Sequence, residues 1–411
     1  MPMPNPGPAR PRTGPRPLAL HLAVQTASWL ASQAALPLLR KGSPVWKGPL
    51  EAQADELRQS LDDANLPPEA FERAVAQEGE RRLKAFLEGV RRYQTHPHRR
   101  AVPPPPVAWT EGTTRLLAYG EAGPPVLLVP SLVNRADILD LTLERSLARD
   151  LAGQGFRVFL VDWDGPGDIE KNFGLDDYIA GRLVRILDHL RQAGGEKVAV
   201  VGYCMGGLLA LALAQLRAQD VASLALLATP WDFHQPNPEP GQLMAALEAP
   251  LEMILQTQGE MPVDMLQAFF ASLDPDLVPR KFRAFAGVDP ANPKANDFIV
   301  LEDWINDGVA LAAPVARQCL FGWYGANRPA KGEWLVGGQA IYPQDLRLPS
   351  LVMVPEQDRI VPPASAIPLA RALPNAKLVM VPAGHIGMMS GRTAPEICYR
   401  PLGAWLKNPR P

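Results

Sequence analysis

Residues 197–214 read KVAVVGYCMGGLLALALA, and this stretch decides the fold. Residues 197–201 form a short apolar run, which is typical of a strand buried on both faces of a sheet. A second apolar run, with helical composition, begins at Gly206. The turn between them is a Gly-x-Cys-x-Gly pattern centred on Cys204, and its glycines leave room for a strained central residue. The stretch therefore predicts a strand, a sharp turn and a helix, with a thiol at the turn.

The predicted surroundings of Cys204 are those of a nucleophile. A thiol at a helix N-terminus is favoured as a thiolate by the helix dipole, and the amide of Met205 can face an oxyanion. One alternative is a buried structural cysteine beside a tight turn. A nucleotide-binding turn is a weaker alternative, because the stretch lacks both the G-x-G-x-x-G pattern and a P-loop lysine.

The same texture extends to both sides of this stretch. Near-continuous apolar strands separated by helices indicate a mostly parallel sheet covered on both faces. Further strands are predicted at 113–119, 125–129, 156–162, 223–228, 350–355 and 377–381, with helices at 143–151, 176–193, 206–218, 363–373 and 394–406. The alternation lapses in between, where helices are predicted at 248–256, 262–272 and 309–323. This middle stretch reads as a cap inserted into one α/β domain.

Proline, at 45 of 411 residues, marks the boundaries outside the α/β pattern. Proline blocks helices and removes backbone donors, so clusters of it predict disorder or stiff linkers. The predicted parts are a disordered arm at 1–17, a helical appendage at 18–100, a linker at 101–110, a catalytic core at 111–229 and 346–411, and the cap at 230–345.

Two helical stripes stand out in the appendage. Apolar residues at helical spacing predict a helix face that must be buried somewhere. The stripes are Leu20, Ala23, Ala27, Leu30 and Ala34 in the first helix, and Phe71, Val75, Leu83, Phe86 and Val90 in a helix at 69–93. The simpler hypothesis is packing on the main domain, and the alternative is contact with a partner or a lipid-like surface.

Two more polar residues follow predicted strands. Asp358 comes soon after the strand at 350–355, and His385 lies in a glycine-flanked loop after the last strand. Each has a plain structural explanation, as a turn aspartate or a satisfied histidine. His234 is the second choice among the histidines. The chain order Cys204, Asp358, His385 is, however, the nucleophile–acid–histidine order of α/β-hydrolases.

Composition excludes several classes of protein. The chain is 47% hydrophobic and 20% charged, with a formal net charge of −2. These values exclude a wholly disordered chain and argue against a nucleic-acid binder. Three widely spaced cysteines predict no disulfide framework and no metal site, and fit a reducing cytosol. Residues 18–39 are apolar but interrupted by polar side chains, so neither a transmembrane segment nor a signal peptide is expected.

The sequence GYCMGG at 202–207 resembles the lipase-like box of polyhydroxyalkanoate synthases, in which cysteine replaces the serine of lipases. The resemblance covers roughly residues 115–407. Other segments similar to the family's markers are 130–134, 138–141, 161–163, 177–178, 228–233, 302–304, 358–363 and 384–387. The chain departs from the family pattern at Asp137, Leu208 and Arg359.

The resemblance implies an α/β-hydrolase fold with an inserted cap, to which this chain adds an N-terminal helical appendage. It implies polymerisation of (R)-3-hydroxyacyl-coenzyme A into polyhydroxyalkanoate through a thioester on Cys204, with coenzyme A released. Asp358 and His385 are the implied acid and base, and the amides of Met205 and Leu132 the implied oxyanion hole. No metal and no bound cofactor are implied, because coenzyme A enters with the substrate.

The short length is similar to the class III-like type, whose catalytic subunit works with a second subunit. The expected partners are therefore a second copy of the chain or a second synthase subunit, and the expected location is the cytoplasm, at the surface of polyester granules. Two other functions remain open. A depolymerase or acyl-thioesterase would use the same three residues on water, and a granule-associated protein could keep the fold without catalysis.

Overall fold

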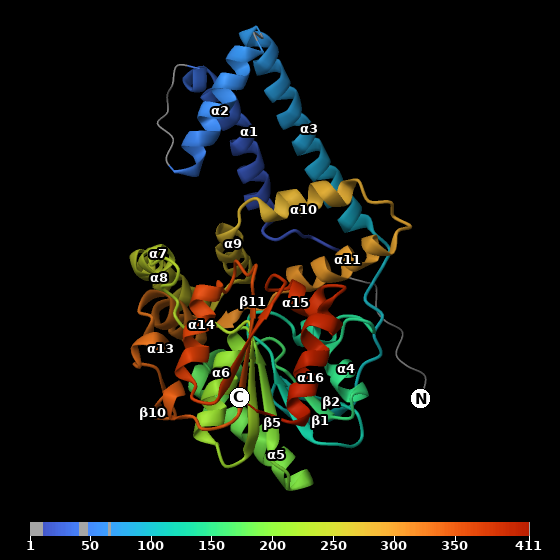
Figure 1. The fold of residues 1–411 in the computed structure, drawn as a ribbon, viewed down its shortest axis with the longest axis vertical. Coiled ribbons are helices and arrows are strands. Elements are labelled where there is room, and N and C mark those ends of the chain that lie inside the picture. The colour runs from blue at the N-terminus through green and yellow to red at the C-terminus, as the bar shows by residue number, and fades with distance from the viewer. Residues whose placement is uncertain (1–10, 41–47, 65–66, 411) are drawn as a thin grey trace. The chain divides into compact units, whose positions relative to one another are not determined.

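The computed structural model describes residues 11–40, 48–64 and 67–410 (Figure 1). The chain divides into two compact units, one of residues 1–98 with 267–306 and one of residues 99–266 with 307–411. Our sequence-based division differs from this, because it placed 267–306 in the cap and 18–100 in a separate appendage. Helices from these two stretches share one apolar core, which explains why they form a single unit.

The larger unit, called the catalytic unit below, is built on an eight-stranded sheet in the order β1-β2-β4-β3-β5-β6-β11-β12. β2 pairs antiparallel with β1 and β4, and the other neighbours pair parallel. The strands are β1 (Val107–Glu111), β2 (Thr114–Tyr119), β3 (Pro125–Val129), β4 (Arg157–Asp162), β5 (Val198–Tyr203), β6 (Val221–Leu227), β11 (Ser350–Pro355) and β12 (Ala376–Val381). The predicted mostly parallel sheet is confirmed.

Helices connect these strands, and every residue of β3, β5 and β11 is buried. The helices of this unit are α4 (Leu147–Gly153), α5 (Val184–Gly194), α6 (Met205–Leu216), α7 (Glu239–Ala246), α8 (Glu248–Gln258), α12 (Ala313–Arg317), α13 (Arg328–Lys331), α14 (Pro363–Ala372), α15 (Gly387–Ser390) and α16 (Arg400–Lys407). Three π-helical segments are Asp177–Leu183, Gln318–Gly325 and Pro395–Tyr399. Short 3₁₀ segments are Ala136–Asp140, Glu170–Asn172 and Pro343–Asp345.

The predicted helix at 309–323 is wrong at its start. The segment instead begins as a strand, β8 (Leu311–Ala312), which pairs with β7 (Glu260–Met261) before α12 begins. The backbone amide of Val309 also donates to the carbonyl of Val133, so pairing with loop residues overrides helical periodicity. A second small ribbon pairs β9 (Leu335–Val336) with β10 (Gln339–Ala340).

The predicted linker at 101–110 is partly structured. Its last residues belong to β1, which begins at Val107. Just before the linker, the guanidinium of Arg100 donates to the backbone carbonyls of Asp140 at 2.6 Å and Leu141 at 3.1 Å. Arg149 donates to the carbonyl of Pro103 at 2.6 Å. The proline run is therefore held against the catalytic unit by arginine side chains.

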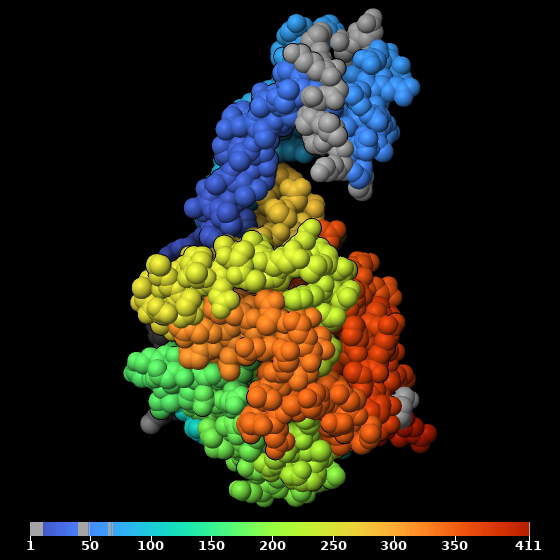
Figure 2. Space-filling model, turned by 90° about the vertical axis from the view of Figure 1, so that its left-hand side faces the viewer, coloured from blue at the N-terminus to red at the C-terminus, as the bar shows by residue number. Residues whose placement is uncertain are grey.

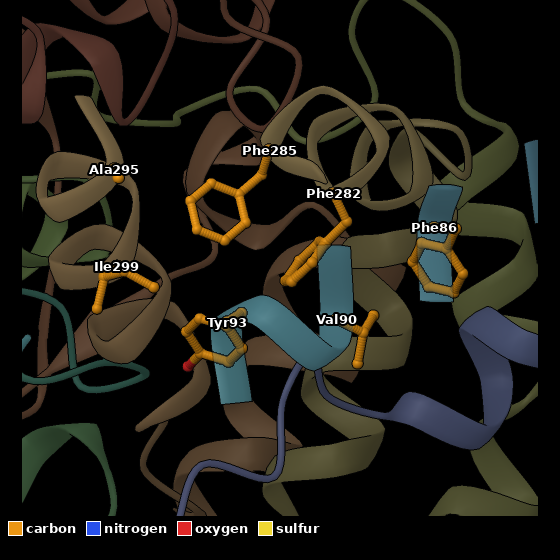
Figure 3. Close-up of a cluster of buried hydrophobic side chains, with 7 residues drawn as sticks. All are labelled: Phe86, Val90, Tyr93, Phe282, Phe285, Ala295 and Ile299. Carbon is orange, nitrogen blue, oxygen red and sulfur yellow. The ribbon is translucent and has the colours of Figure 1, made fainter. Parts of the chain in front are cut away.

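The smaller unit, called the helical unit below, packs the N-terminal helices against two helices from the predicted cap. Its helices are α1 (Leu18–Arg40), α2 (Pro49–Asp63), α3 (Pro68–Thr95), α10 (Leu277–Ala286) and α11 (Pro293–Asn306). The chain boundary between the units, at residues 266 and 267, falls within α9 (Val263–Leu273). Its buried core, drawn in Figure 3, consists of Phe86, Val90, Tyr93, Phe282, Phe285, Ala295 and Ile299. α3 and α10 approach so closely that a Cβ on Gly89 would lie 2.0 Å from the carbonyl oxygen of Phe282.

The two predicted apolar stripes differ in burial in this unit. In the α3 stripe, Phe86 and Val90 are buried and the other members are half-buried. In the α1 stripe all five members are exposed, and Leu30 has 58% of its surface accessible. Figure 2 shows α1 in dark blue at the surface. The buried residues of α1 are instead His21, Leu36 and Leu39.

The N-terminal arm, predicted to be disordered at 1–17, is described only from residue 11, and 1–10 lie outside the described residues. Residues 11–17 are held by side chains of the helical unit. Arg12 forms a bidentate ion pair with Asp303 at 2.5 and 2.7 Å, and Tyr93 donates to the same carboxylate at 3.0 Å. The amide of Arg16 donates to Asn306 Oδ1 at 2.7 Å. Within the three described ranges, no helix is long and apolar enough to cross a membrane.

Candidate active site

Cys204 occupies a strained elbow between β5 and α6. Its φ of 56° and ψ of −128° lie in a region that non-glycine residues rarely adopt. Two backbone bonds hold it there: its amide donates to the carbonyl of Leu227 at 2.8 Å, and its carbonyl accepts from the amide of Gly207 at 2.9 Å. The predicted strand–turn–helix unit is confirmed, and strain on this scale is found chiefly at functional sites.

The glycines of the box are required by close approach. A Cβ on Gly206 would lie 2.1 Å from the carbonyl oxygen of Val129, and one on Gly207 would lie 1.9 Å from Thr229 Oγ1. Either contact is far inside van der Waals distance. The first turn of α6 can therefore begin directly against the end of β3 and the segment that follows β6.

His385 and Asp358 form a buried pair at the ends of β12 and β11. His385 Nδ1 donates to Asp358 Oδ2 at 2.6 Å, and the two residues are only 8% and 5% exposed. The other oxygen of Asp358 accepts from the amides of Ile360 at 2.9 Å and Val361 at 2.8 Å. Both oxygens are thus engaged, so the carboxylate is fixed and holds the imidazole with its proton on Nδ1.

The electrostatics of the site favour a charged imidazole. Burial lowers the pKa of His385, but the negative charges at Cys204 and Asp358 and hydrogen bonds to both side chains outweigh burial and raise that pKa to about 10. A proton on His385 is therefore favoured by acidic groups on both sides of the ring, Cys204 and Asp358. The structure therefore brings the three predicted residues together, with the side chain of His385 hydrogen-bonded to both Cys204 and Asp358.

The other two thiols are unlike Cys204. All three cysteines are free, but Cys319 and Cys398 are buried whereas Cys204 is partly accessible. Burial raises the pKa of Cys398 to about 12, and it raises the pKa of Cys319 well above its ordinary range. Neither of these thiols ionises readily near neutral pH.

The predicted oxyanion donors come from two adjacent strands. Met205 is the first residue of α6, directly after the elbow, and Leu132 lies three residues beyond the end of β3, which pairs with β5. The segment that carries Leu132 is held in place by Trp163, whose indole NH donates to the carbonyl of Pro130 at 3.1 Å. This tryptophan belongs to one of the markers quoted above, at 161–163.

His234, the second choice among the histidines, serves the structure. Its Nε2 lies 3.1 Å from the carbonyl oxygens of both Tyr324 and Gly325 and donates to them. Its neighbour Asp232 accepts from Asn327 Nδ2 at 2.8 Å. Residues 232–234, beyond the end of β6, are thus tied to residues 324–327.

Two tyrosines near the site were missed by reasoning from the sequence. Tyr203 directly precedes the nucleophile, and its hydroxyl donates to the backbone carbonyl of His385 at 3.1 Å. Tyr324 lies in a π-helical segment, and burial followed by the negative charge at Cys204 raises its pKa. The position of Tyr203 in the box was a usable signal, but nothing local in the sequence marks Tyr324.

This fold and this site define the class of the protein. The alpha/beta hydrolase fold family matches residues 124–391, which include all three predicted catalytic residues. Nucleophile elbow, acid and histidine follow one another in that class's chain order.

Proteins with similar sequences identify the family within this class. The chain is 32% identical to "Poly(3-hydroxyalkanoate) polymerase subunit PhaC" of Allochromatium vinosum over 296 residues, which are 70% of this chain and 82% of that protein. The protein of the same name from Synechocystis is 32% identical over 66% of this chain and 75% of its own length. That of Thiocystis violacea is 31% identical over 69% and 81%. The chain belongs to the family of poly(3-hydroxyalkanoate) polymerase subunits PhaC, which confirms the resemblance seen in its motifs.

Proposed function

We propose that this protein is the catalytic subunit of a polyhydroxyalkanoate polymerase, an acyltransferase that joins (R)-3-hydroxyacyl units from coenzyme A thioesters and releases coenzyme A. The observation that carries the proposal is the cysteine, rather than a serine, at the nucleophile elbow beside a buried His385–Asp358 pair. Membership of the PhaC family supports it.

The choice of cysteine suits acyl transfer between thioesters. A thiolate that attacks a coenzyme A thioester forms another thioester of similar energy. The acyl group therefore stays activated, and its later transfer to an alcohol remains downhill. A hydrolase needs only water as its second acceptor, and serine is sufficient for that purpose.

Acylation follows from the three side chains. His385 takes the proton of the Cys204 thiol, and the resulting thiolate attacks the thioester carbonyl. In our proposal the amides of Met205 and Leu132 bind the oxyanion that develops on the carbonyl oxygen. When the intermediate collapses, the carbon–sulfur bond to coenzyme A breaks and His385 returns its proton to the departing thiolate. Asp358 stabilises the imidazolium throughout.

Chain growth then joins two units. The hydroxyl of one acyl unit attacks the thioester carbonyl of another, an ester bond forms, and the cysteine sulfur leaves. The hydroxyl proton is taken by His385 or by Asp358, which are the two alternatives that the site offers. No bound cofactor takes part in this cycle. We propose that the protein works at the surface of its polyester product, together with a second copy or a second synthase subunit.

The deciding experiment uses purified protein and 3-hydroxybutyryl-coenzyme A. We expect coenzyme A release together with an insoluble ester-linked polymer. Coenzyme A release with free 3-hydroxybutyrate would instead identify a thioesterase, and no release would favour a non-catalytic granule protein. Cys204→Ala is the negative control and should release nothing, whereas Cys319→Ala should behave like the wild type because its thiol is buried and is not part of the elbow.

A further inference from the structure

We propose that Tyr203 is a positioning residue that holds His385 beside Cys204, and this inference rests on the proposed roles of those two residues. Tyr203 is the last residue of β5 and directly precedes the nucleophile. Its hydroxyl donates to the backbone carbonyl of His385 at 3.1 Å. Its ring centroid lies 5.3 Å from that of the imidazole, with an angle of 33° between the planes. One side chain therefore joins the strand of the nucleophile to the loop of the base.

The loop around His385 depends on this bond. The carbonyl of Ala383 accepts from the amide of Gln357 at 3.0 Å, and the carbonyl of Gly384 accepts from Met388 at 3.0 Å. The carbonyl of Ile386 accepts from the amides of residues 389 and 390. These three neighbours are thus paired with backbone donors, whereas the carbonyl of His385 accepts from the Tyr203 side chain.

The surroundings of Tyr203 keep its hydroxyl protonated, so that it remains a hydrogen-bond donor. It is 3% exposed, so water does not compete for its hydroxyl. Burial, followed by the negative charges at Cys204 and Asp358, raises the pKa of Tyr203 well above its ordinary value. Its hydroxyl proton therefore stays in place at every pH at which the site works. Loss of that hydroxyl would leave a buried carbonyl unpaired, and a loop responds to this by shifting.

Two anchors then act on the histidine from different directions. Asp358 fixes the rotation and tautomer of the imidazole through Nδ1. Tyr203 fixes the backbone that carries the ring, and it does so from the residue adjacent to the thiol. Because Tyr203 and Cys204 are consecutive in a strained elbow, this bond sets the distance between the imidazole and the sulfur.

The test measures the thiolate directly and requires no acyl-coenzyme A. Iodoacetamide alkylates thiolates, and Cys204 is the partly accessible thiol, as peptide mapping would verify. We would measure the alkylation rate of Cys204 against pH in the wild type, Tyr203→Phe and Tyr203→Leu. The matched control is Tyr119→Phe, which also removes a buried hydroxyl. Tyr119 is the last residue of β2, and its hydroxyl donates to Asp140 at 3.0 Å.

We expect Tyr203→Phe to alkylate about tenfold more slowly at pH 7 and its profile to move toward higher pH, because the thiolate loses its imidazolium partner. Tyr203→Leu, which also lacks the ring, should be slower still, and Tyr119→Phe should match the wild type. If Tyr203→Leu fails to fold, Tyr203→Phe decides alone.

The inference is overturned if Tyr203→Phe shows the wild-type profile, or if both phenylalanine variants lose melting temperature equally with unchanged alkylation. A wild type that makes no polymer but whose thiolate depends on Tyr203 would contradict the proposed function and support the positioning role. The two failures are therefore separable.

Discussion

α6 and α1 are both apolar helices without a charged side chain along most of their length, yet the molecule uses them in opposite ways. α6 is buried from Met205 to Ala214. α1 has no charged residue between Leu18 and Leu39, but its most regular apolar stripe is exposed. α6 is therefore part of the core of the catalytic unit, whereas α1 contributes only one of its sides to the core of the helical unit.

The difference comes from what lies at the start of each helix. α6 begins at an elbow whose glycines permit backbone contact with the end of β3 and the segment after β6. α1 follows a coil that is held by polar contacts, among them the Arg12–Asp303 ion pair. A helix with apolar residues on two sides can bury either side, and periodicity alone does not say which. The buried side is decided by where the backbones of neighbouring segments approach closely.

The largest predicted change is a loss of turnover, caused by a substitution in the catalytic unit. Asp358→Asn keeps the oxygen that accepts from Ile360 and Val361, but it presents an NH₂ group to His385 Nδ1. The imidazole must then carry its proton on Nε2, facing the thiol, and it can no longer accept the thiol proton. We expect a loss of turnover of about 10³-fold with little change in stability.

Single-turnover kinetics sharpen this prediction. If Asp358 also serves as the base for the hydroxyl, chain growth falls at least as much as the first acyl transfer. If only the first transfer falls, the acid acts as an orienting residue for His385 and has no role in chain growth.

The next effect tests the core of the helical unit. Phe282 is fully buried and packs edge-to-face against Phe86 and Tyr93 of α3. Phe282→Ala should therefore destabilise this unit by about 3–5 kcal/mol. Denaturant titration followed by hydrogen exchange of the α3 amides measures the loss. Unchanged protection of those amides would show that α3 and α10 are not a cooperative pair.

A smaller effect concerns the charge on His385. Its raised pKa, about 10, depends in part on the negative charge of Cys204, so Cys204→Ala should lower it. Nitrogen NMR of the imidazole would show the shift, with Cys319→Ala as the control. Because the folded pKa is raised, the proton's contribution to stability is complete below the ordinary pKa of 6.5 and is lost as the pH rises through about 10. Equal midpoints in wild type and Cys204→Ala would refute the thiolate–imidazolium pair.

The smallest effect belongs to the exposed stripe. Leu30→Ser should change the free energy of unfolding by less than about 0.5 kcal/mol, because the side chain contributes little to the core of its unit. The comparison with Phe282→Ala, in the same assay, separates the buried stripe from the exposed one. A loss above about 1 kcal/mol for Leu30→Ser would mean that something covers this face.

Much of the catalytic unit was predictable, because its signals are local. Buried strands such as β3 and β11 are short apolar runs with turn residues at both ends, and their predicted bounds match the structure. The elbow at Cys204 and the pairing of Asp358 with His385 followed from chain order at strand ends. The shared unit of α3 and α10 could not be predicted, because it joins segments about two hundred residues apart through side-chain contacts alone. Tyr203 lies within the quoted sequence box, but its hydrogen-bond partner is a backbone carbonyl, which no sequence pattern identifies.

Polymerisation through Cys204 requires a covalent acyl group on its sulfur, and mass spectrometry detects such a group directly. Excess enzyme would be mixed with 3-hydroxybutyryl-coenzyme A, quenched in acid within one turnover and digested. We predict that the peptide containing Cys204 gains the mass of a 3-hydroxybutyryl group through a thioester that hydroxylamine removes, and that Cys204→Ala gains none. Coenzyme A release without an adduct on Cys204, or an adduct on another residue, would contradict a covalent mechanism at Cys204.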